Sequence, residues 1–320
     1  MTSLASKDAK VLGETPPSQL IAPMRETALD TSPTEIRQRF ADDAYVCLPG
    51  FLAKDNVSAV REAVFTRLDE AGEIRGAPAD GIYSGTSQRR ENIADLGKFW
   101  REVSENWSLR RVTHSRALHE LCDVLLDEPC IPQDYLFLRA ANFGRQTLLH
   151  SDSGFFARMT DKVVTVWISF GDIPLHLGPL FVMEKSHQHP RVTDALANFD
   201  VARDKDKKAS WSETPIELAK QLPSRLLTRH MKPGDIVVFG MHLLHGSLDN
   251  VDPGQRIRLS CDIRYQAQSE PRDPRYFGPH PGGTTGAGYG EVAGATPLNE
   301  EWHKGHSTSL TLNKKTREKK

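Results

Sequence analysis

The spacing of apolar residues predicts several helices in the first part of the chain. The clearest pattern runs from Asp55 to Gly72, and its apolar residues fall on one helical face. Asp55 can cap the start of this helix, and Gly72 can end it. Asp30-Thr31-Ser32-Pro33 offers polar capping residues and an early proline and predicts the start of a helix that reaches about Ala41, and further helices are predicted at 99–107 and 115–126. Residues 73–92 are rich in glycine and polar side chains, which is typical of a loop.

Beyond Pro132 the pattern changes to short apolar runs separated by turns. Residues 162–170 form the strongest run, which is rich in β-branched and aromatic residues and predicts a strand. Further strands are predicted at 45–50, 135–139, 179–183, 225–231, 236–239 and 256–266. The turn sequence at 232–235 predicts that the two strands beside it pair as a hairpin. This order of elements predicts a mainly β barrel or sandwich with helices packed outside it.

Stretches without clear periodicity set the limits of the predicted domain. Residues 1–32 are rich in Ser, Thr, Pro and charge, and are predicted to form a flexible leader. Residues 280–320 are predicted to form a flexible tail. Between them, 33–279 is predicted to be a single domain. The long, charged segment 191–224 within this domain is predicted to be a lid-like insertion that closes over a substrate.

Composition narrows the class of protein. The 320 residues include 38% hydrophobic and 26% charged residues, which is ordinary for a soluble globular protein. The formal net charge of -1 gives no field that favours nucleic acid or an anionic membrane. The sequence contains no apolar run of transmembrane length and no secretory signal. The four cysteines form no CxxC pair, which indicates core thiols in a reducing compartment, and the cytoplasm is the expected location.

A candidate metal site begins with His150-Ser151-Asp152, which is the only HxD sequence in the chain. Residues two apart on an extended strand point to the same face, so His150 and Asp152 can reach one ion. His245 would supply a second imidazole from another strand. Two histidines and one carboxylate form the facial triad of non-haem iron(II) oxygenases. The positions that these ligands leave open suit a bidentate 2-oxo acid and O2.

An arginine near the last predicted strand can bind the co-substrate. A guanidinium group makes a two-point contact with a carboxylate, such as the distal one of 2-oxoglutarate. Arg256 and Arg258 both follow His245 and would face the same side of a strand; the spacing from His245 favours Arg256. Ser247 can either hydrogen-bond the co-substrate carboxylate or only shape a turn. Trp167 can either border the co-substrate pocket or belong to the core.

The remaining histidines near these motifs are expected to bind no metal. His242 precedes His245 by three positions at a strand end, so it is predicted to point elsewhere. His187 and His189 follow an apolar strand and are predicted to be solvated or structural loop residues. His176 lies between Pro174 and Gly178 and is predicted to be a turn residue.

Taken together, these motifs resemble the phytanoyl-CoA dioxygenase family of iron(II)/2-oxoglutarate oxygenases. The similar segments agree with the family in order and spacing from about 34 to 268: they are 43–52, 149–152, 166–172, 178–187 and 245–256. The resemblance implies a double-stranded β-helix core, also called a jelly-roll or cupin-like fold. It also implies that His150, Asp152 and His245 bind iron(II) and that Arg256 binds 2-oxoglutarate.

The resemblance further implies a dioxygenase that uses O2 to oxidise an unactivated C–H bond of a small organic molecule, releasing succinate and CO2. Halogenating relatives have a small residue at the position of Asp152, so the carboxylate favours hydroxylation, desaturation or ring closure. Residues 153–158 and 191–224 match no substrate-specific signature, so an acyl-CoA substrate is not carried over. Two alternatives remain: a cupin-like metal enzyme that does not use 2-oxoglutarate, and a non-catalytic ligand-binding barrel.

Overall fold

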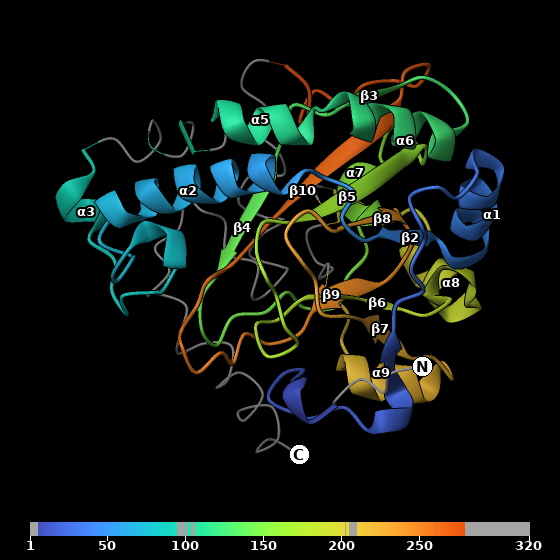
Figure 1. Cartoon of the computed structure of the whole chain (residues 1–320). Helices are drawn as coiled ribbons and strands as arrows, with labels where there is room; N and C mark the ends of the chain where they lie inside the picture. Colours follow the sequence, from blue (N-terminus) through green and yellow to red (C-terminus); the bar gives the residue numbers. More distant parts are fainter. Residues whose placement is uncertain are drawn as a thin grey trace.

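The computed structural model describes residues 6–94, 99, 102–103, 106–201, 203–204 and 210–278, and two β-sheets form its centre (Figure 1). The larger sheet has the order β2-β8-β5-β10-β3, with β4 also paired to β10; the smaller has the order β1-β7-β6-β9. The strands of the larger sheet are β2 (Tyr45–Leu48), β3 (Cys130–Pro132), β4 (Phe137–Ala141), β5 (Val163–Ser169), β8 (Ile236–Gly240) and β10 (Arg258–Ala267). Those of the smaller sheet are β1 (Ile21–Pro23), β6 (Leu180–Met183), β7 (Leu226–Thr228) and β9 (His245–Ser247).

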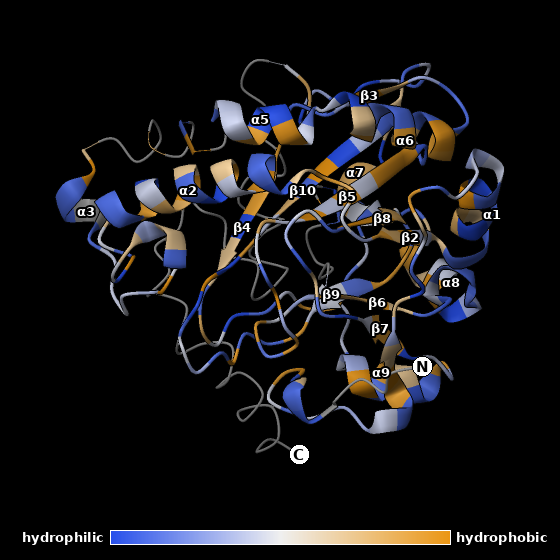
Figure 2. Ribbon diagram, viewed as in Figure 1, coloured by the Kyte–Doolittle hydropathy of each residue, from blue (hydrophilic) through white to orange (hydrophobic). Residues whose placement is uncertain are grey.

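Helices surround this two-sheet core, except for the short α7 (Ser153–Phe156), whose four residues are buried. The others are α1 (Pro33–Asp43), α2 (Lys54–Glu70), α3 (Arg89–Asn92), α5 (Trp107–Thr113), α6 (Arg116–Leu126), α8 (Pro190–Leu196) and α9 (Pro215–Gln221). Helices α2, α5 and α6 lie along one side of the larger sheet (Figure 1). Both α2 and α6 carry alternating hydrophobic and hydrophilic positions, as expected of surface helices (Figure 2). The predicted mainly β fold with flanking helices and a jelly-roll core is confirmed.

Strand β10 shows how the sequence pattern builds the core. Its odd-numbered residues, Leu259 to Tyr265, belong to the apolar cluster that also contains residues of α2 and α6. The even-numbered residues from Arg258 to Arg264 are polar but also buried, and they therefore point to the opposite face, between the sheets. A polar face inside a protein requires partners or a ligand, so this face is the place to look for a site.

Most predicted elements are present, with shifted ends. Ser32 accepts a hydrogen bond from the Glu35 N–H at 3.3 Å and begins α1, as the sequence predicts. The strand predicted at 135–139 is β4, which begins two residues later at Phe137. Of the helix predicted at 99–107, the described residues 99, 102 and 103 are helical, and a further helix, α5, begins at Trp107. Among the described residues, no helix has the length and apolar content needed to cross a bilayer.

The prediction of a flexible leader is wrong for residues 6–32. Strand β1 pairs in parallel with β7, with Ile21 opposite Leu226. The backbone N–H groups of Leu12 and Gly13 donate to the Asp249 carboxylate at 2.9 and 2.6 Å. The docking combines strand pairing at a sheet edge with burial of Ala9, Val11 and Ile21 in an apolar cluster, and composition did not reveal it because these apolar residues are scattered among polar ones. Residues 1–5 and the predicted tail at 280–320 lie outside the described residues.

The predicted hairpin across 232–235 is also wrong. Strand β7 pairs with β1 and β6 in the smaller sheet, whereas β8 pairs with β2 and β5 in the larger one. The turn itself is present, because the Asp235 carboxylate accepts the Lys232 N–H at 2.8 Å. The chain therefore uses this turn to cross from one sheet to the other. A turn sequence specifies a local change of direction but not the strand with which the chain pairs next.

The insertion at 191–224 is more structured than its sequence indicates. It contains most of α8 and all of α9, and α9 begins with a capping box between Thr214 and Glu217. Ser210 forms a β-bridge with His150, and the Trp211 N–H donates to the Leu149 carbonyl at 2.9 Å. The insertion thus lies directly against the segment that carries the HxD sequence. Residues 202 and 205–209 lie outside the described part.

Candidate metal centre

The structure brings His150, Asp152 and His245 together. His150 and His245 lie opposite each other in an antiparallel bridge: each backbone N–H donates to the other carbonyl, at 3.0 and 2.9 Å. Such a pair directs both side chains to the same face. Asp152 Oδ1 lies 3.7 Å from Nε2 of His150 and 3.8 Å from Nε2 of His245. One donor atom from each residue lies within 4.8 Å of the others, so one ion can contact all three.

The backbone reaches this arrangement by a different route from the one that the sequence predicts. The extended segment ends near His150, and Asp152 lies at the N-cap of α7 with φ -80° and ψ -14°. The two ligands therefore converge at a strand-to-helix turn rather than along one continuous strand. The three residues themselves are the ones identified from the sequence.

Both imidazoles have a fixed orientation. His150 Nδ1 lies 2.8 Å from the Leu148 carbonyl oxygen, and His245 Nδ1 lies 3.0 Å from the Leu243 carbonyl oxygen. A carbonyl only accepts, so each Nδ1 carries the proton and each Nε2 keeps its lone pair for a metal. This backbone contact is the usual way in which a protein sets the tautomer of a metal-binding histidine.

The ionisation of the three residues suits a cation. Burial and the neighbouring His245 imidazole lower the pKa of His150 to about 3. Burial also lowers the pKa of His245. Burial by itself would raise the pKa of Asp152, but the Arg264 guanidinium, the two histidines and the Thr165 hydroxyl group together outweigh it and hold that pKa well below its usual value. Two neutral imidazoles and one carboxylate therefore face one point at neutral pH, and this donor set fits iron(II).

Two buried arginines, Arg258 and Arg264, and the partly buried Arg139 line the polar face near this centre. Arg139 pairs with Asp262 at 2.7 Å, and Arg264 pairs with Asp152 at 2.9 Å. Arg258 is 2% exposed and donates to Ser260 Oγ at 3.0 Å. Its Nε has no hydrogen-bond partner, and no carboxylate of the described residues lies within ion-pair distance of it. Burial lowers the pKa of Arg258 to about 10, and the Arg139 charge adds to this effect. A buried cation without a bound anion marks a place for an anionic ligand.

Arg256 lies in a different environment from Arg258. Its guanidinium forms an ion pair with Asp252 at 2.7 Å, and its side chain is 36% exposed. It also lies 3.2 Å from His176 Nε2. Strand β10 begins at Arg258, two residues further on. The structure thus places Arg256 in a partly exposed ion pair before the strand and Arg258 on the inner face of β10. Residues two apart would share a face only if both belonged to the same strand.

Ser247 and Trp167 are both buried between or beside the sheets. Ser247 Oγ accepts the Thr147 N–H at 2.8 Å, so it ties β9 to the segment before His150. Trp167 is 2% exposed and packs in a cluster with residues of both sheets, including Val182 of β6 and Val237 of β8. These contacts account for a structural role of each residue, and contact with a co-substrate stays a prediction.

His242 and His189 have partners other than the candidate metal ligands. His242 pairs with Asp161 at 3.2 Å on the surface. His189 accepts the Arg191 N–H at 3.2 Å and caps α8. Within the described residues, the three-ligand group at 150, 152 and 245 is the one set of three or more metal-binding side chains.

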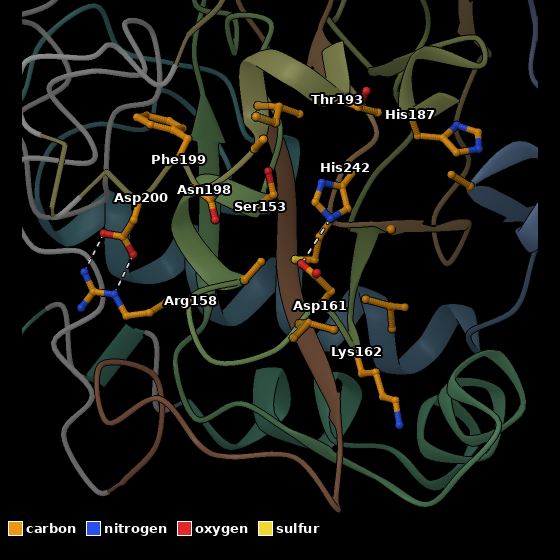
Figure 3. A pocket seen from close by; sticks show the side chains of 18 of the residues that line it. Ser153, Arg158, Asp161, Lys162, His187, Thr193, Asn198, Phe199, Asp200 and His242 are labelled. Carbon is orange, nitrogen blue, oxygen red and sulfur yellow. Dashed lines mark hydrogen bonds and ion pairs between the residues drawn. The ribbon is translucent and has the colours of Figure 1, made fainter. Parts of the chain in front are cut away.

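A cavity of about 950 Å³ lies beside α7 and the insertion (Figure 3), and none of the three candidate ligands is among the described residues that line it. Its wall includes Ser153, which follows the ligand Asp152, and Met241, which precedes the segment of His245. The Ser153 N–H donates to the Met241 carbonyl at 2.9 Å, so these two residues join at the cavity wall. Leu196 and Phe199 of the insertion form another part of the wall.

Sequence reasoning missed Arg264, Thr165 and the Arg139–Asp262 pair. For Asp262 and Arg264 the signal is present in the alternation of β10, where a charged or hydroxyl side chain occupies every second position from Arg258 to Arg264. In a strand whose other face is apolar, such a row predicts a buried polar face. The partners of this row still could not be read from the sequence, because they lie on β4, β5 and α7.

Comparison with known proteins identifies a family. The sequence profile of the family described as phytanoyl-CoA dioxygenase (PhyH) matches residues 40–258, which is more than half of the chain. Among curated proteins, none has a sequence that matches this chain significantly.

Several solved structures have a similar fold. The epimerase SnoN, in complex with Fe3+, alpha ketoglutarate and nogalamycin RO, has a TM-score of 0.52 at 16% identity, covering 83% of this chain and 95% of its own. The carbocyclase SnoK from nogalamycin biosynthesis has a TM-score of 0.52 at 17% identity, covering 87% and 96%. EctD from S. alaskensis, with 2-oxoglutarate and 5-hydroxyectoine, has a TM-score of 0.51 at 18% identity, covering 82% and 89%.

Proposed function

Since the chain belongs to the phytanoyl-CoA dioxygenase family of iron(II)/2-oxoglutarate oxygenases, we propose that it oxidises an unactivated C–H bond of a small organic molecule and releases succinate and CO2. The observation that carries this proposal is the convergence of three buried donors with fixed orientation, His150, Asp152 and His245. Iron(II) held there would supply the activation of O2 that couples decarboxylation of 2-oxoglutarate to oxidation of the substrate.

The protein groups around the metal have separate tasks. The Leu148 and Leu243 carbonyls hold the two imidazoles so that each Nε2 faces the ion. All three ligand side chains are at least 95% buried, which excludes bulk water from the centre. Asp152 occupies a ligand position that would otherwise be free for chloride, which supports hydroxylation, desaturation or ring closure rather than halogenation.

Arg258 is the proposed ligand of the distal 2-oxoglutarate carboxylate, in place of the Arg256 that the sequence favours. Arg258 lies on the same face of β10 as Arg264, whose guanidinium contacts the metal ligand Asp152. Besides burial, the Arg139 charge lowers the pKa of both Arg258 and the candidate ligand His150, which supports a position of Arg258 on the side of the sheet toward which a dianion bound to the ion would extend. The pairing of Arg256 with Asp252 supports the same choice, because a carboxylate already neutralises that guanidinium.

The substrate is proposed to enter through the cavity beside α7. The insertion forms one wall of it and is fixed on α7 by several contacts: Phe199 packs on Gly154, the Val201 N–H donates to the Gly154 carbonyl at 3.0 Å, and Asp200 binds Arg158 at 2.6 Å. Opening of these contacts would widen the proposed route from the cavity to the candidate ligands. The predicted lid would then be the part of the insertion that makes these contacts. The wall residues of the insertion would then select the substrate.

The state of the cysteines bears on the proposed location. All four are buried free thiols: Cys47, Cys122, Cys130 and Cys261. Free thiols are usual in proteins of reducing compartments. This supports the proposal that the protein works in the cytoplasm.

The test of the proposed function is anaerobic binding. Iron(II) and 2-oxoglutarate are added to the purified protein, and the visible metal-to-ligand charge-transfer band is recorded. We expect a band in the parent protein and its loss in a folded His150→Ala variant. A protein that binds iron but gives no band would be a cupin-like enzyme that does not use 2-oxoglutarate. A folded protein that binds neither would be a ligand-binding barrel, and both results reject the proposal.

A further inference from the structure

Arg264 forms a buried ion pair with the carboxylate of the candidate metal centre. It is 1% exposed, and its Nη2 lies 2.9 Å from Asp152 Oδ2. Its guanidinium also lies 4.0 Å from the centre of the Phe156 ring, on the short helix that follows Asp152. Charge-assisted contacts of this kind are stronger and more directional than ordinary hydrogen bonds. Arg264 therefore fixes both the carboxylate and the turn that carries it.

A second donor reaches the same oxygen. Thr165 Oγ1 donates to Asp152 Oδ2 at 2.6 Å. Thr165 lies on β5 directly opposite Arg264 on β10, so the two donors come from paired positions of adjacent strands. Two neighbouring strands at the centre of a sheet form a rigid support. Both contacts involve Oδ2, whereas Oδ1 faces the Nε2 atoms of the two histidines.

We propose that Arg264 and Thr165 are positioning residues that hold Asp152 as a one-oxygen ligand. A carboxylate that turns freely can bind a metal through one oxygen or through both. With Oδ2 engaged by two donors, only Oδ1 is presented to the ion. This leaves three positions of a six-coordinate metal open, which is the number that a bidentate 2-oxo acid and O2 require. The inference rests on the proposed iron centre and deepens it.

A merely structural role for Arg264 makes a different prediction. In that case the guanidinium only neutralises a buried carboxylate, and its removal would destabilise the fold without changing the coordination of the metal. In the positioning role, loss of Arg264 allows Oδ2 to bind the ion as well. The number of open positions then falls from three to two. Coordination, rather than stability or activity, is therefore the property to measure.

The experiment uses the full chain loaded with Mn(II), whose EPR lines broaden with each bound 17O-labelled water. We expect three exchangeable waters in the parent and two in Arg264→Met, with partial recovery of the third in Arg264→Lys. Thr165→Val removes the other donor and is expected to act in the same direction as Arg264→Met. This second variant also tests the proposal if Arg264→Met does not fold.

A second readout is the affinity for 2-oxoglutarate in the Fe(II)-loaded protein, followed anaerobically by the charge-transfer band. We expect a loss of about tenfold or more in Arg264→Met, as is common for groups that orient metal ligands. Arg229→Met is the matched control, since Arg229 also pairs with a buried carboxylate. This is Asp235, at 3.1 Å, which lies just before the first residue of β8. It is expected to lower stability but to leave the water count and this affinity unchanged.

Two results would overturn the proposal. One is an unchanged water count in folded Arg264→Met and Thr165→Val proteins. The other is an equal change in Arg229→Met, which would mean that the effect follows stability alone. The Mn(II) measurement does not depend on 2-oxoglutarate. If the parent gives no charge-transfer band, the proposed function fails while the water count still tests the role of Arg264.

Discussion

Replacement of Arg258 by methionine separates two effects that the structure assigns to one side chain. Arg258 is 2% exposed and has no carboxylate of the described residues at ion-pair distance, whereas Arg256 is 36% exposed and paired with Asp252. If Arg258 binds a dianion, its buried charge has no bound counter-charge in the ligand-free protein and therefore lowers the stability of the fold. The Arg258→Met variant should therefore lose co-substrate affinity and gain stability in the absence of ligands.

The gain in stability follows from the pKa of Arg258. Burial and the Arg139 charge lower it from 12.5 to about 10. Each pKa unit corresponds to about 1.4 kcal/mol, so the charged form is disfavoured by about 3 kcal/mol. The variant also loses the hydrogen bond to Ser260, worth about 1 kcal/mol. We therefore expect the metal-free variant to be more stable than the parent by about 2 kcal/mol.

The loss of affinity follows from the contact that Arg258 would make. A hydrogen bond to a charged group contributes about 1.5 to 3 kcal/mol, and a guanidinium offers two to one carboxylate. Loss of both would weaken binding of 2-oxoglutarate by at least roughly a hundredfold. Arg256→Met should change this affinity by less than about fivefold, because an exposed ion pair contributes only about 0 to 1 kcal/mol.

The assay combines urea unfolding of the metal-free proteins with anaerobic titration of the charge-transfer band in the Fe(II)-loaded proteins. The parent, Arg258→Met and Arg256→Met are compared under the same conditions. Normal 2-oxoglutarate binding in Arg258→Met together with its loss in Arg256→Met would refute the assignment. A clear loss of stability in metal-free Arg258→Met would refute the argument from burial.

Three further predictions concern the core and the cavity. The pKa of His150 is about 3 in the folded protein, so on acidification its imidazole takes up a proton in the unfolded state first. His150 alone should therefore lower the free energy of unfolding of the metal-free protein by about 1.4 kcal/mol between pH 7.5 and 5.5; urea unfolding of His150→Gln should lack this share and keep that of the buried His245. A Cβ on Gly154 would lie 2.7 Å from the Phe199 ring. Gly154→Ala should therefore lower the free energy of unfolding by about 1 to 3 kcal/mol and make proteolysis within 191–224 faster. Trp167→Ala should lower the free energy of unfolding, measured in urea, by about 3 to 5 kcal/mol, because Trp167 is 2% exposed between the sheets. A decrease below about 1 kcal/mol would contradict this packing.

The sequence by itself determined most of the elements and the candidate metal ligands. Helix α1 could be located because the Ser32 cap and the early proline act within one turn. Strand β5 could be located because β-branched and aromatic residues follow one another without interruption. His150, Asp152 and His245 could be chosen because few side chains bind metals, and their order along the chain is distinctive. All of these signals are local or chemical, so they are visible before folding.

Only the tertiary structure decided which segments meet. Arg256 and Arg258 are two residues apart and would face the same side of one continuous strand. Strand β10 begins only at Arg258, so Arg256 lies outside it in a partly exposed ion pair while Arg258 is buried. Strand β7 pairs with β1 rather than with β8, because the chain crosses from one sheet to the other at a turn whose sequence is typical of a hairpin. Arg264 reaches Asp152 across more than a hundred residues of chain. Such contacts depend on strand pairing between distant segments, and a one-dimensional pattern contains no information about the partner.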